Sequence, residues 1–201
     1  MGGHMTLKPI ASLTVAVGLC CSCSTSIVQE NGPEKQVAEK PFVAGGNIEM
    51  RLDSGNYAIR PAASDQIRVS FGGNAGSASA ELFGNGSLAT VAVKDAPLNN
   101  FHATIEVPKT SNLTIHLKAG NLEVGAITGD KDVTSTAGNV EIAVGDASAY
   151  ASADGSVTAG DIDAGAFGKS ASGINPHFEW TGQGKYKLHA SLGAGNLVLR
   201  R

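Results

Sequence analysis

Apolar and polar residues alternate along much of the chain after Phe42. The alternation is clearest in Ile48–Leu52, Ile105–Val107 and Leu113–Leu117, where every second side chain is apolar. Successive side chains of a β-strand point to opposite faces, so this pattern predicts strands with one buried face. Glycine, asparagine and serine residues separate these runs, as turns require. The pattern therefore predicts an all-β domain over residues 41–201.

Glycines in the C-terminal half of the chain are spaced almost evenly. Intervals of 18, 17, 18 and 22 residues separate five of them, Gly120, Gly138, Gly155, Gly173 and Gly195. Most of them open one short phrase, as in Gly120–Val124 and Gly138–Ile142. A fixed period near 20 residues is typical of chains that stack one structural unit on the next. We therefore predict a single-stranded β-helix, or β-solenoid, with coils of roughly 17–22 residues; a β-sandwich with unconnected turns is the alternative.

The same phrases predict what occupies each corner of a coil and what fills its core. Glycine adopts positive φ without steric cost, so we expect the five glycines at corners. Asparagine follows glycine at positions 121, 139 and 196, and stacked asparagine side chains can form a hydrogen-bonded ladder. Alignment on the glycines predicts three core columns and a looser fourth. The three are Leu122, Val140 and Val157; Val124, Ile142 and Ala159; and Ile127, Val144 and Ile162; the fourth is Val133, Tyr150 and Phe167.

The N-terminus has the features of an export signal. In residues 1–26, Lys8 precedes an apolar run over residues 10–19, which is too short to span a membrane as a helix. The cysteines that follow resemble a bacterial lipoprotein signal, so we expect a lipid anchor on Cys23, Cys20 or Cys21. Ordinary signal cleavage near Ser24 or Ser26 is the alternative. Either route exports the protein, to be anchored facing the periplasm or cell surface or to be secreted. The polar residues 27–40 are expected to form a flexible tether.

Several phrases together resemble a known family. They are Ile105–Pro108, Leu113–Ile115 and Lys118–Val124, with Gly184–Leu188 and Gly195–Leu199 near the C-terminus. They resemble the bacterial putative-adhesin family of domains of unknown function, which repeats a small-Gly-Asn/Asp-apolar-x-apolar phrase after a strand that ends in Val-Pro. The resemblance covers roughly residues 42–201. It implies a small β-helix on an exported or surface-attached bacterial protein, and it assigns no catalytic residue.

Composition narrows the possible partners and cofactors. The formal net charge is −3 and no basic cluster occurs, so nothing favours a nucleic-acid partner. All three cysteines lie within residues 20–23, which excludes a disulfide or a cysteine-based zinc site in the folded part. The sequence lacks the tandem calcium-binding repeat and the dinucleotide or phosphate-binding fingerprints. We therefore predict no metal and no cofactor.

Three side chains are candidates for contact with a ligand. Asp161 and Asp163 flank Ile162, so both should point outward, where they could form the carboxylate pair of a carbohydrate-active enzyme. Acidic residues beside glycine are more often ordinary turn formers, and we favour that interpretation. Trp180 shares a strand face with Phe178 and could stack on sugars. We favour the alternative, in which these rings cover the last apolar layer of the coil stack.

These features together predict an exported, lipid-anchored envelope protein without catalysis. It would act as a scaffold or binding module, with the membrane as one partner and a cell-envelope protein or glycan as the other. Two alternatives remain open. One is a polysaccharide lyase or hydrolase that works at Asp161 and Asp163, and the other is an accessory protein that senses the state of the envelope.

Overall fold

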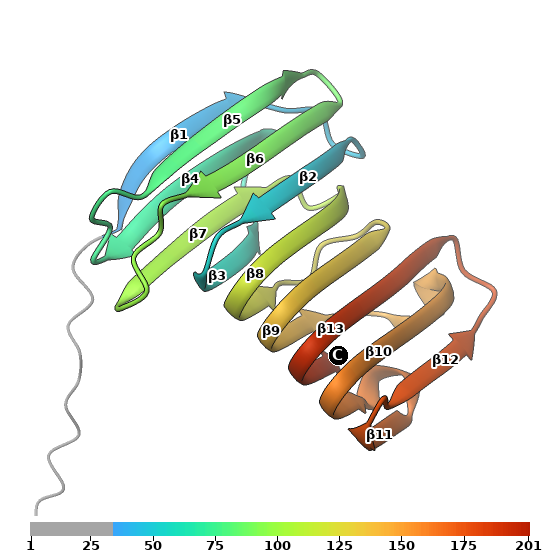
Figure 1. Ribbon diagram of the computed structural model, residues 1–201. Helices are drawn as coiled ribbons and strands as arrows, with labels where there is room; N and C mark the ends of the chain where they lie inside the picture. The colour runs from blue at the N-terminus through green and yellow to red at the C-terminus, as the bar shows by residue number, and fades with distance from the viewer. Residues whose placement is uncertain (1–33) are drawn as a thin grey trace, which may run out of the picture. The chain divides into compact units, whose positions relative to one another are not determined.

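The computed structural model of the chain describes residues 34–201 (Figure 1). The predicted signal segment, the lipidation candidates Cys20, Cys21 and Cys23, and residues 27–33 of the predicted tether lie outside the described residues. The described part is all-β, as predicted, with thirteen strands and two short 3-10 turns. Within residues 34–201, neither helical segment has the length and apolar character that a membrane span needs.

The elements follow one another without a long loop. In chain order they are β1 (Lys35–Pro41), β2 (Asn47–Leu52), β3 (Gly55–Pro61), β4 (Gln66–Gly73), β5 (Ser79–Asn85), β6 (Leu88–Lys94), β7 (Phe101–Val107), β8 (Asn112–Val124), β9 (Lys131–Ala143), η1 (Ala147–Ala149), β10 (Tyr150–Ala164), η2 (Gly165–Phe167), β11 (Lys169–Ile174), β12 (His177–Thr181) and β13 (Tyr186–Arg200).

Four long strands bend near their middle. Strands β8, β9, β13 and β10 each pass through a glycine with φ between 118° and 144°, and in Figure 1 their ribbons fold back on themselves. The bend divides each strand into a first and a second half. Strands β2 and β3 pair with the first and second halves of β8, so they follow the same path with a break between them.

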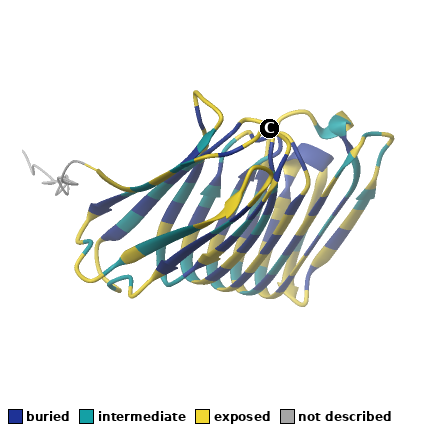
Figure 2. Cartoon of the chain, turned by 90° about the horizontal axis from the view of Figure 1, so that it is seen from above, coloured by how far each residue is buried: buried dark blue, intermediate teal, exposed yellow. Residues whose placement is uncertain are grey.

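The bends divide the sheet into two arms. The first arm contains β5, β6, β2, the first halves of the four long strands, and β12. The second arm contains β1, β4, β7, β3, the second halves, and β11. Apolar side chains of both arms form one core, and buried positions alternate with exposed ones along each strand (Figure 2). This alternation is the period of two that the sequence showed.

The strands do not stack in the order of the chain. We call each parallel layer that runs from the first arm to the second a tier. The tiers lie in the order β6–β7, β2–β3, β8, β9, β13 and β10. Antiparallel strands flank both ends of this stack, β4 and β5 at one end and β11 and β12 at the other. A single-stranded β-helix is therefore not shown, because the sheet is mixed and β13 lies between β9 and β10.

The predicted corners are only partly those of the structure. Gly120, Gly138 and Gly195 lie opposite one another at the bends, as expected. The fourth bend is at Gly160, not at the predicted Gly155, which lies within the first half of β10. Gly173 has positive φ but belongs to the antiparallel strand β11, opposite Gly160.

The shift from Gly155 to Gly160 also changes the predicted core columns. Ile162, not Val157, lies opposite Leu197 and so continues the column of Leu122 and Val140. Val157 lies in the first arm, opposite Leu192. The bend position is fixed by close approach of neighbouring backbones, since a Cβ on Gly160 would overlap the carbonyl oxygen of Gly195. The predicted Ala159 likewise lies before the bend, opposite Ala194.

The predicted asparagine ladder is present beside the bends. Asn196 Nδ2 donates to Asn139 Oδ1 at 2.9 Å, Asn139 Nδ2 to Asn121 Oδ1 at 3.0 Å, and Asn121 Nδ2 to Asn56 Oδ1 at 2.8 Å. Asn56 Nδ2 in turn donates to the carbonyl oxygen of Phe101 at 3.5 Å. The ladder therefore runs across four tiers and extends the three predicted positions to β3.

Strand β1 corrects the predicted boundary between tether and domain. Residues 35–40 were expected within the tether of residues 27–40, but they pair with β4 in an antiparallel ladder. Most side chains of β1 are exposed, so its sequence is polar although its backbone pairs with β4. The folded domain thus begins at or before Lys35, not at residue 41.

The core contains one deeply buried lysine. Lys131 at the start of β9 is 2% exposed, and its Nζ donates to the carbonyl of Ile127 at 2.6 Å and to the Tyr150 hydroxyl at 2.7 Å. Burial lowers the pKa of Lys131 to about 8. Burial also raises the pKa of the Tyr150 hydroxyl to about 12. This ammonium is therefore held by neutral oxygens within the fold and is unavailable to a surface ligand.

Candidate ligand-binding groove

The two predicted acidic residues point outward, as expected, and the structure gives them different surroundings. Asp161 and Asp163 are exposed on either side of the buried Ile162. Asp163 Oδ1 accepts a hydrogen bond from the Gly165 amide at 3.0 Å, which is a turn interaction. Asp161 lies opposite Asn196, at the end of the asparagine ladder. Neither carboxylate lines the groove described below.

Trp180 belongs to an aromatic cluster at the β10 end of the stack. Its ring lies 4.9 Å from the ring of Phe167, and Phe167 also stacks on Phe178 at 6.3 Å. Tyr150 contacts Phe167 edge-on at 6.0 Å. Phe178 is 5% exposed and Trp180 is partly buried against this core. The packing favours the interpretation of these rings as a cover for the last apolar layer.

A groove of about 830 Å³ lies on the outward face of the first arm. Side chains of β2, β5, β6, β8 and β9 line it. Alternation along each strand explains its polar character, since Arg51, His116 and Thr134 point outward while the residues between them point into the core. Its polar lining is Glu49, Arg51, Asp53, Glu81, Thr90, Lys94, Asp95, His116, Lys118, Thr134 and Thr136.

The lysine and arginine side chains of the groove are each paired with an acidic one. Lys118 Nζ lies 2.7 Å from Asp53 Oδ1 and Lys94 Nζ lies 2.7 Å from Glu81 Oε2. The hydrogen bond from Lys118 lowers the pKa of the Asp53 carboxyl, and the same contact raises the pKa of Lys118. Arg51 pairs with Glu49 in its own strand at 2.8 Å. Because each lysine and arginine of the groove is matched by a neighbouring carboxylate, none of the three is left to attract an anionic ligand.

Exposed apolar side chains lie at one side of the groove. Phe83 of β5 lines it and is 58% exposed, and it lies opposite Thr90 in the β5–β6 ladder. Leu88 is also 58% exposed and lines an adjoining recess of about 450 Å³ together with Phe83. An exposed aromatic ring beside hydroxyl and amide groups can stack on a ligand ring while those groups supply hydrogen bonds.

Sequence reasoning missed this groove. One sequence feature could have pointed to the groove: the apolar pair Leu82-Phe83 directly before the turn Gly84-Asn85-Gly86. Neighbouring residues of a β-strand point to opposite faces of the sheet, so only one of these two side chains can face the core and the other must be exposed. The charged lining could not have been found in the same way, because its residues come from five strands that are separated in the chain.

A second polar contact on the first arm has the form of an acid–base pair. His189 Nδ1 of β13 lies 2.5 Å from Asp154 Oδ2 of β10. The pair lines a different recess, together with Asp130 and Lys187. Among the described residues, no hydroxyl or thiol forms a hydrogen bond with His189. Residues 34–201 also hold no group of three His, Cys, Asp or Glu side chains arranged to bind a metal ion.

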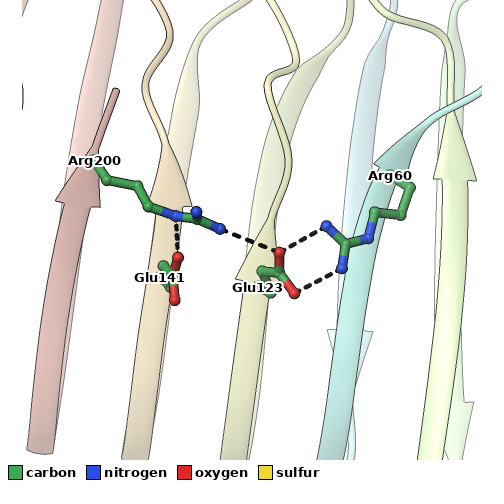
Figure 3. A network of polar contacts seen from close by, with 4 residues as sticks. All are labelled: Arg60, Glu123, Glu141 and Arg200. Carbon is green, nitrogen blue, oxygen red and sulfur yellow. Dashed lines mark hydrogen bonds and ion pairs between the residues drawn. The ribbon is translucent and has the colours of Figure 1, made fainter.

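The outward face of the second arm carries an ion-pair network (Figure 3). Glu123 and Glu141 are directly opposite each other on β8 and β9, where two like charges would repel. Arg60 binds both oxygens of Glu123 at 2.6 and 2.7 Å, and Arg200 contacts Glu123 at 3.3 Å and also pairs with Glu141. The network neutralises both carboxylates and joins four tiers. We interpret it as a structural contact.

Comparison with known proteins gives two structural neighbours. No protein-family model matches the chain, and no curated protein is similar to it in sequence. A putative cell adhesion protein from Clostridium sporogenes ATCC 15579 is 12% identical, with 84% of this chain and 99% of that chain covered and a TM-score of 0.49. A putative adhesin from Bacteroides fragilis NCTC 9343 is 8% identical, with 84% and 97% covered and a TM-score of 0.26. At these identities neither shows that this chain belongs to their family.

Proposed function

We propose that this protein is an exported, lipid-anchored binding module of the bacterial cell envelope, without catalysis, that holds an uncharged glycan in the groove of the first arm. The observation that carries the proposal is the groove lining. Threonine and locally paired charges offer hydrogen bonds, and Phe83 offers an exposed ring at one side. Sugars are recognised through this combination of hydroxyl-directed hydrogen bonds and aromatic stacking.

Export and anchoring rest on the N-terminal sequence. The apolar run of residues 10–19, followed by cysteines and then by a folded domain rich in strands, supports a lipoprotein. Palmitate labelling of the full chain tests this directly. No labelling of the unchanged chain would contradict a lipid anchor, and labelling that persists after Cys20, Cys21 and Cys23 are changed together to serine would contradict an anchor on these cysteines.

Binding is tested by titrating the full chain with neutral and acidic polysaccharides. We expect neutral polysaccharides to bind, and Phe83→Ala to weaken binding about tenfold or more, which corresponds to about 1.4 kcal/mol. The matched control is Ile174→Ala, because Ile174 is also an exposed apolar side chain, at 87%, but lies on β11 away from the groove. Equal affinity of Phe83→Ala and the unchanged protein would remove the groove from the proposal.

The absence of catalysis has its own test. The full chain should release no reducing or unsaturated sugar ends from the polysaccharides that it binds. If it does release them, the double variant Asp161→Asn with Asp163→Asn separates the two functions. A sharp loss of turnover in that variant would support the polysaccharide lyase or hydrolase that the sequence left open.

A further inference from the structure

The exposed apolar side chains are distributed unevenly along the stack. Six large apolar side chains of residues 34–201 are between 41% and 87% exposed, and five of them precede β7 in the chain: Val37, Val43, Phe83, Leu88 and Leu98. The sixth, Ile174, lies on β11 at the opposite end of the stack. Phe83 and Leu88 line the groove and its adjoining recess. Val37, Val43 and Leu98 line neither, so the groove does not account for their exposure.

These three side chains belong to one end of the stack, which we call the N-terminal end. It consists of β1, β5 and the turns of residues 42–46, 74–78 and 95–100, beside the β6–β7 tier (Figure 1). Among the described strands, β1 pairs with β4 alone and β5 with β6 alone, so both are edge strands. The N-terminal end therefore combines two strand edges with three exposed apolar side chains.

The most exposed of the three, Leu98, lies in the turn between β6 and β7 and is 86% exposed. The Asn74 amide donates to the Asn100 carbonyl at 2.7 Å, which ties this turn to the turn between β4 and β5. Residues 74–78 and 96–100 contain no lysine, arginine, aspartate or glutamate. The two turns therefore present Leu98 on a surface where no charged side chain has to lose its water when an apolar phase approaches.

The first described residue lies beside the same turn. Glu34 Oε1 is 3.8 Å from His102 Nε2 on β7. The His102 ring in turn packs against Gly73, where an added Cβ would lie 3.2 Å from its Nδ1 and would overlap the Asn100 carbonyl oxygen. Contacts thus lead from Glu34 to the turn that carries Leu98. The chain enters the folded domain at its N-terminal end.

The length of chain before Glu34 limits its distance from a lipid anchor. Cys23 precedes Glu34 by 11 residues and Cys20 precedes it by 14. A fully extended chain spans about 3.3–3.6 Å per residue, so Glu34 can lie at most roughly 35–50 Å from an anchor at these positions. The stack itself measures about 29 Å from the β6–β7 tier to β11, at about 4.8 Å per strand. An anchor therefore keeps the N-terminal end near the membrane and leaves the β11 end free to point away from it.

We propose that the N-terminal end of the stack rests on the lipid surface, with Leu98 among the lipid head groups and the β11 end outermost. The inference rests on the lipid anchor of the proposed function. One acyl chain alone binds a membrane weakly and reversibly, so apolar side chains that enter the interface beside it strengthen the attachment. Val37 and Val43 lie at the same end and add to this contact. The groove opens along the outward face of the first arm, so contact at the N-terminal end leaves it accessible.

Quenching of tryptophan fluorescence by brominated lipid tests this orientation. Full chains with Leu98→Trp or Ile174→Trp are produced in a bacterium, purified with their lipid and inserted into vesicles of phosphatidylcholine or its brominated form. Ile174→Trp is the matched control, because Ile174 is equally exposed, at 87%, and lies at the other end of the stack. Interfacial side chains lie about 5–10 Å deep, so we expect brominated lipid to remove about half or more of the added emission in Leu98→Trp and none in Ile174→Trp. The unchanged chain gives the emission of Trp180, which is subtracted from both.

Flotation with the vesicles separates failure of the inference from failure of the anchor. Chains that float with the vesicles but show no quenching of Leu98→Trp, or equal quenching in both variants, would overturn the inference and leave the anchor in place. Chains that do not float with the vesicles would contradict the anchor, and the inference with it.

A second copy of the protein is the other possible occupant of the N-terminal end. It is tested without vesicles, on the full Leu98→Trp chain with Cys20, Cys21 and Cys23 changed to serine. Protection of the new tryptophan from iodide that rises with protein concentration would assign this end to a dimer and overturn the inference. Circular dichroism checks the folding of each variant, and Asn99→Trp in the same turn replaces Leu98→Trp if that chain does not fold.

Discussion

Two pairs of neighbouring strands have the same local structure but different connections along the chain. One pair is β8 and β9, and the other is β13 and β10. In both pairs the strands are parallel, the bend glycines are opposite each other, and Gly is followed by Asn or Asp. β8 and β9 are consecutive in the chain, whereas β13 and β10 lie in reverse order in the stack. The glycine phrase thus determines how one tier bends and packs, and the order of the tiers comes from elsewhere.

The difference between the two pairs lies in their connections. β8 reaches β9 through the short segment of residues 125–130, so the next tier can only be the adjacent one. Between β10 and β13 the chain first forms β11 and β12, which cover both arms of β10 on the same side. With that side covered, the remaining place beside β10 is the one next to β9.

The largest loss of unfolding free energy should come from the substitution of a bend glycine that lies between two tiers. Gly138→Ala should cost about 3–5 kcal/mol of unfolding free energy, because φ there is 122° and the new Cβ would overlap the Gly120 carbonyl. Gly173→Ala is the matched control, since φ is 112° but no atom lies within 4 Å of its Cβ position, so about 1 kcal/mol is expected. Urea denaturation measures both. Equal losses would mean that backbone conformation alone, without the neighbouring tier, explains the glycine.

Truncation of either of two buried side chains on the facing strands β9 and β13 should lower the unfolding free energy by a similar amount. The two side chains should pack at different stages of folding. Ile142 and Leu199 lie opposite each other and are 0% and 1% exposed, so Ile142→Ala and Leu199→Ala should each cost about 2–5 kcal/mol. If β13 takes its place between β9 and β10 last, Leu199→Ala should mainly speed unfolding, while Ile142→Ala should also slow folding. Stopped-flow folding and unfolding rates distinguish the two. A slowed folding rate in Leu199→Ala would place β13 early in folding.

The buried lysine of β9 makes stability depend on pH. The folded chain releases the Lys131 proton near pH 8 and the unfolded chain near pH 10.5, so unfolding takes up a proton between these values. The unfolding free energy should therefore rise with pH over this range, by about 3 kcal/mol at most. The raised pKa of Tyr150 acts in the opposite direction above pH 10, because its folded form keeps a proton that the unfolded form loses.

Lys131→Met tests this dependence against Lys169→Met. The first variant should lose the rise between pH 8 and 10, and the second should keep it, because Lys169 is exposed on β11. Guanidinium denaturation at several pH values gives the comparison. A rise that survives in Lys131→Met would have to come from another group.

The smallest effect should come from the ion pairs that join β13 to β8. Arg200→Ala should cost about 1 kcal/mol or less at low salt and less still at high salt, because the side chain is 52% exposed. Arg51→Ala is the control, because Arg51 pairs with Glu49 of its own strand and should be near neutral. Thermal unfolding at two salt concentrations measures both. A salt-independent loss in Arg200→Ala would indicate packing of its stem and not charge.

The sequence predicted the local features of this fold well. The period of two along Leu113–Leu117, the bends at Gly120 and Gly138, and the asparagine ladder all depend on residues close together in the chain, and all are present. The outward placement of Asp161 and Asp163 and the shared strand face of Phe178 and Trp180 follow from the same alternation.

Features that depend on distant partners could not be predicted in this way. The even spacing of glycines in the sequence predicted a bend at Gly155. The bend is at Gly160, and this follows only from the pairing of Gly160 with Gly195 on a later strand. The sequence of β1 resembles a tether because most of its side chains are exposed and polar. It is held in the sheet by backbone hydrogen bonds to β4, which require no apolar pattern. The groove combines residues of five strands, so no single segment carries its signature.

The asparagine ladder has a direction. Each of its amides donates toward the β3 side and accepts from the β10 side, so the row begins at the carbonyl of Phe101 and proceeds one way through Asn56, Asn121, Asn139 and Asn196. Opposite Asn196, the next tier carries Asp161, and a carboxylate offers acceptors where a further asparagine would donate its amide. A row of asparagines can be lengthened by adding like tiers indefinitely, and a carboxylate at its end terminates it. The direction of this one row of hydrogen bonds therefore distinguishes the two ends of the stack, and the row ends at the β10 tier.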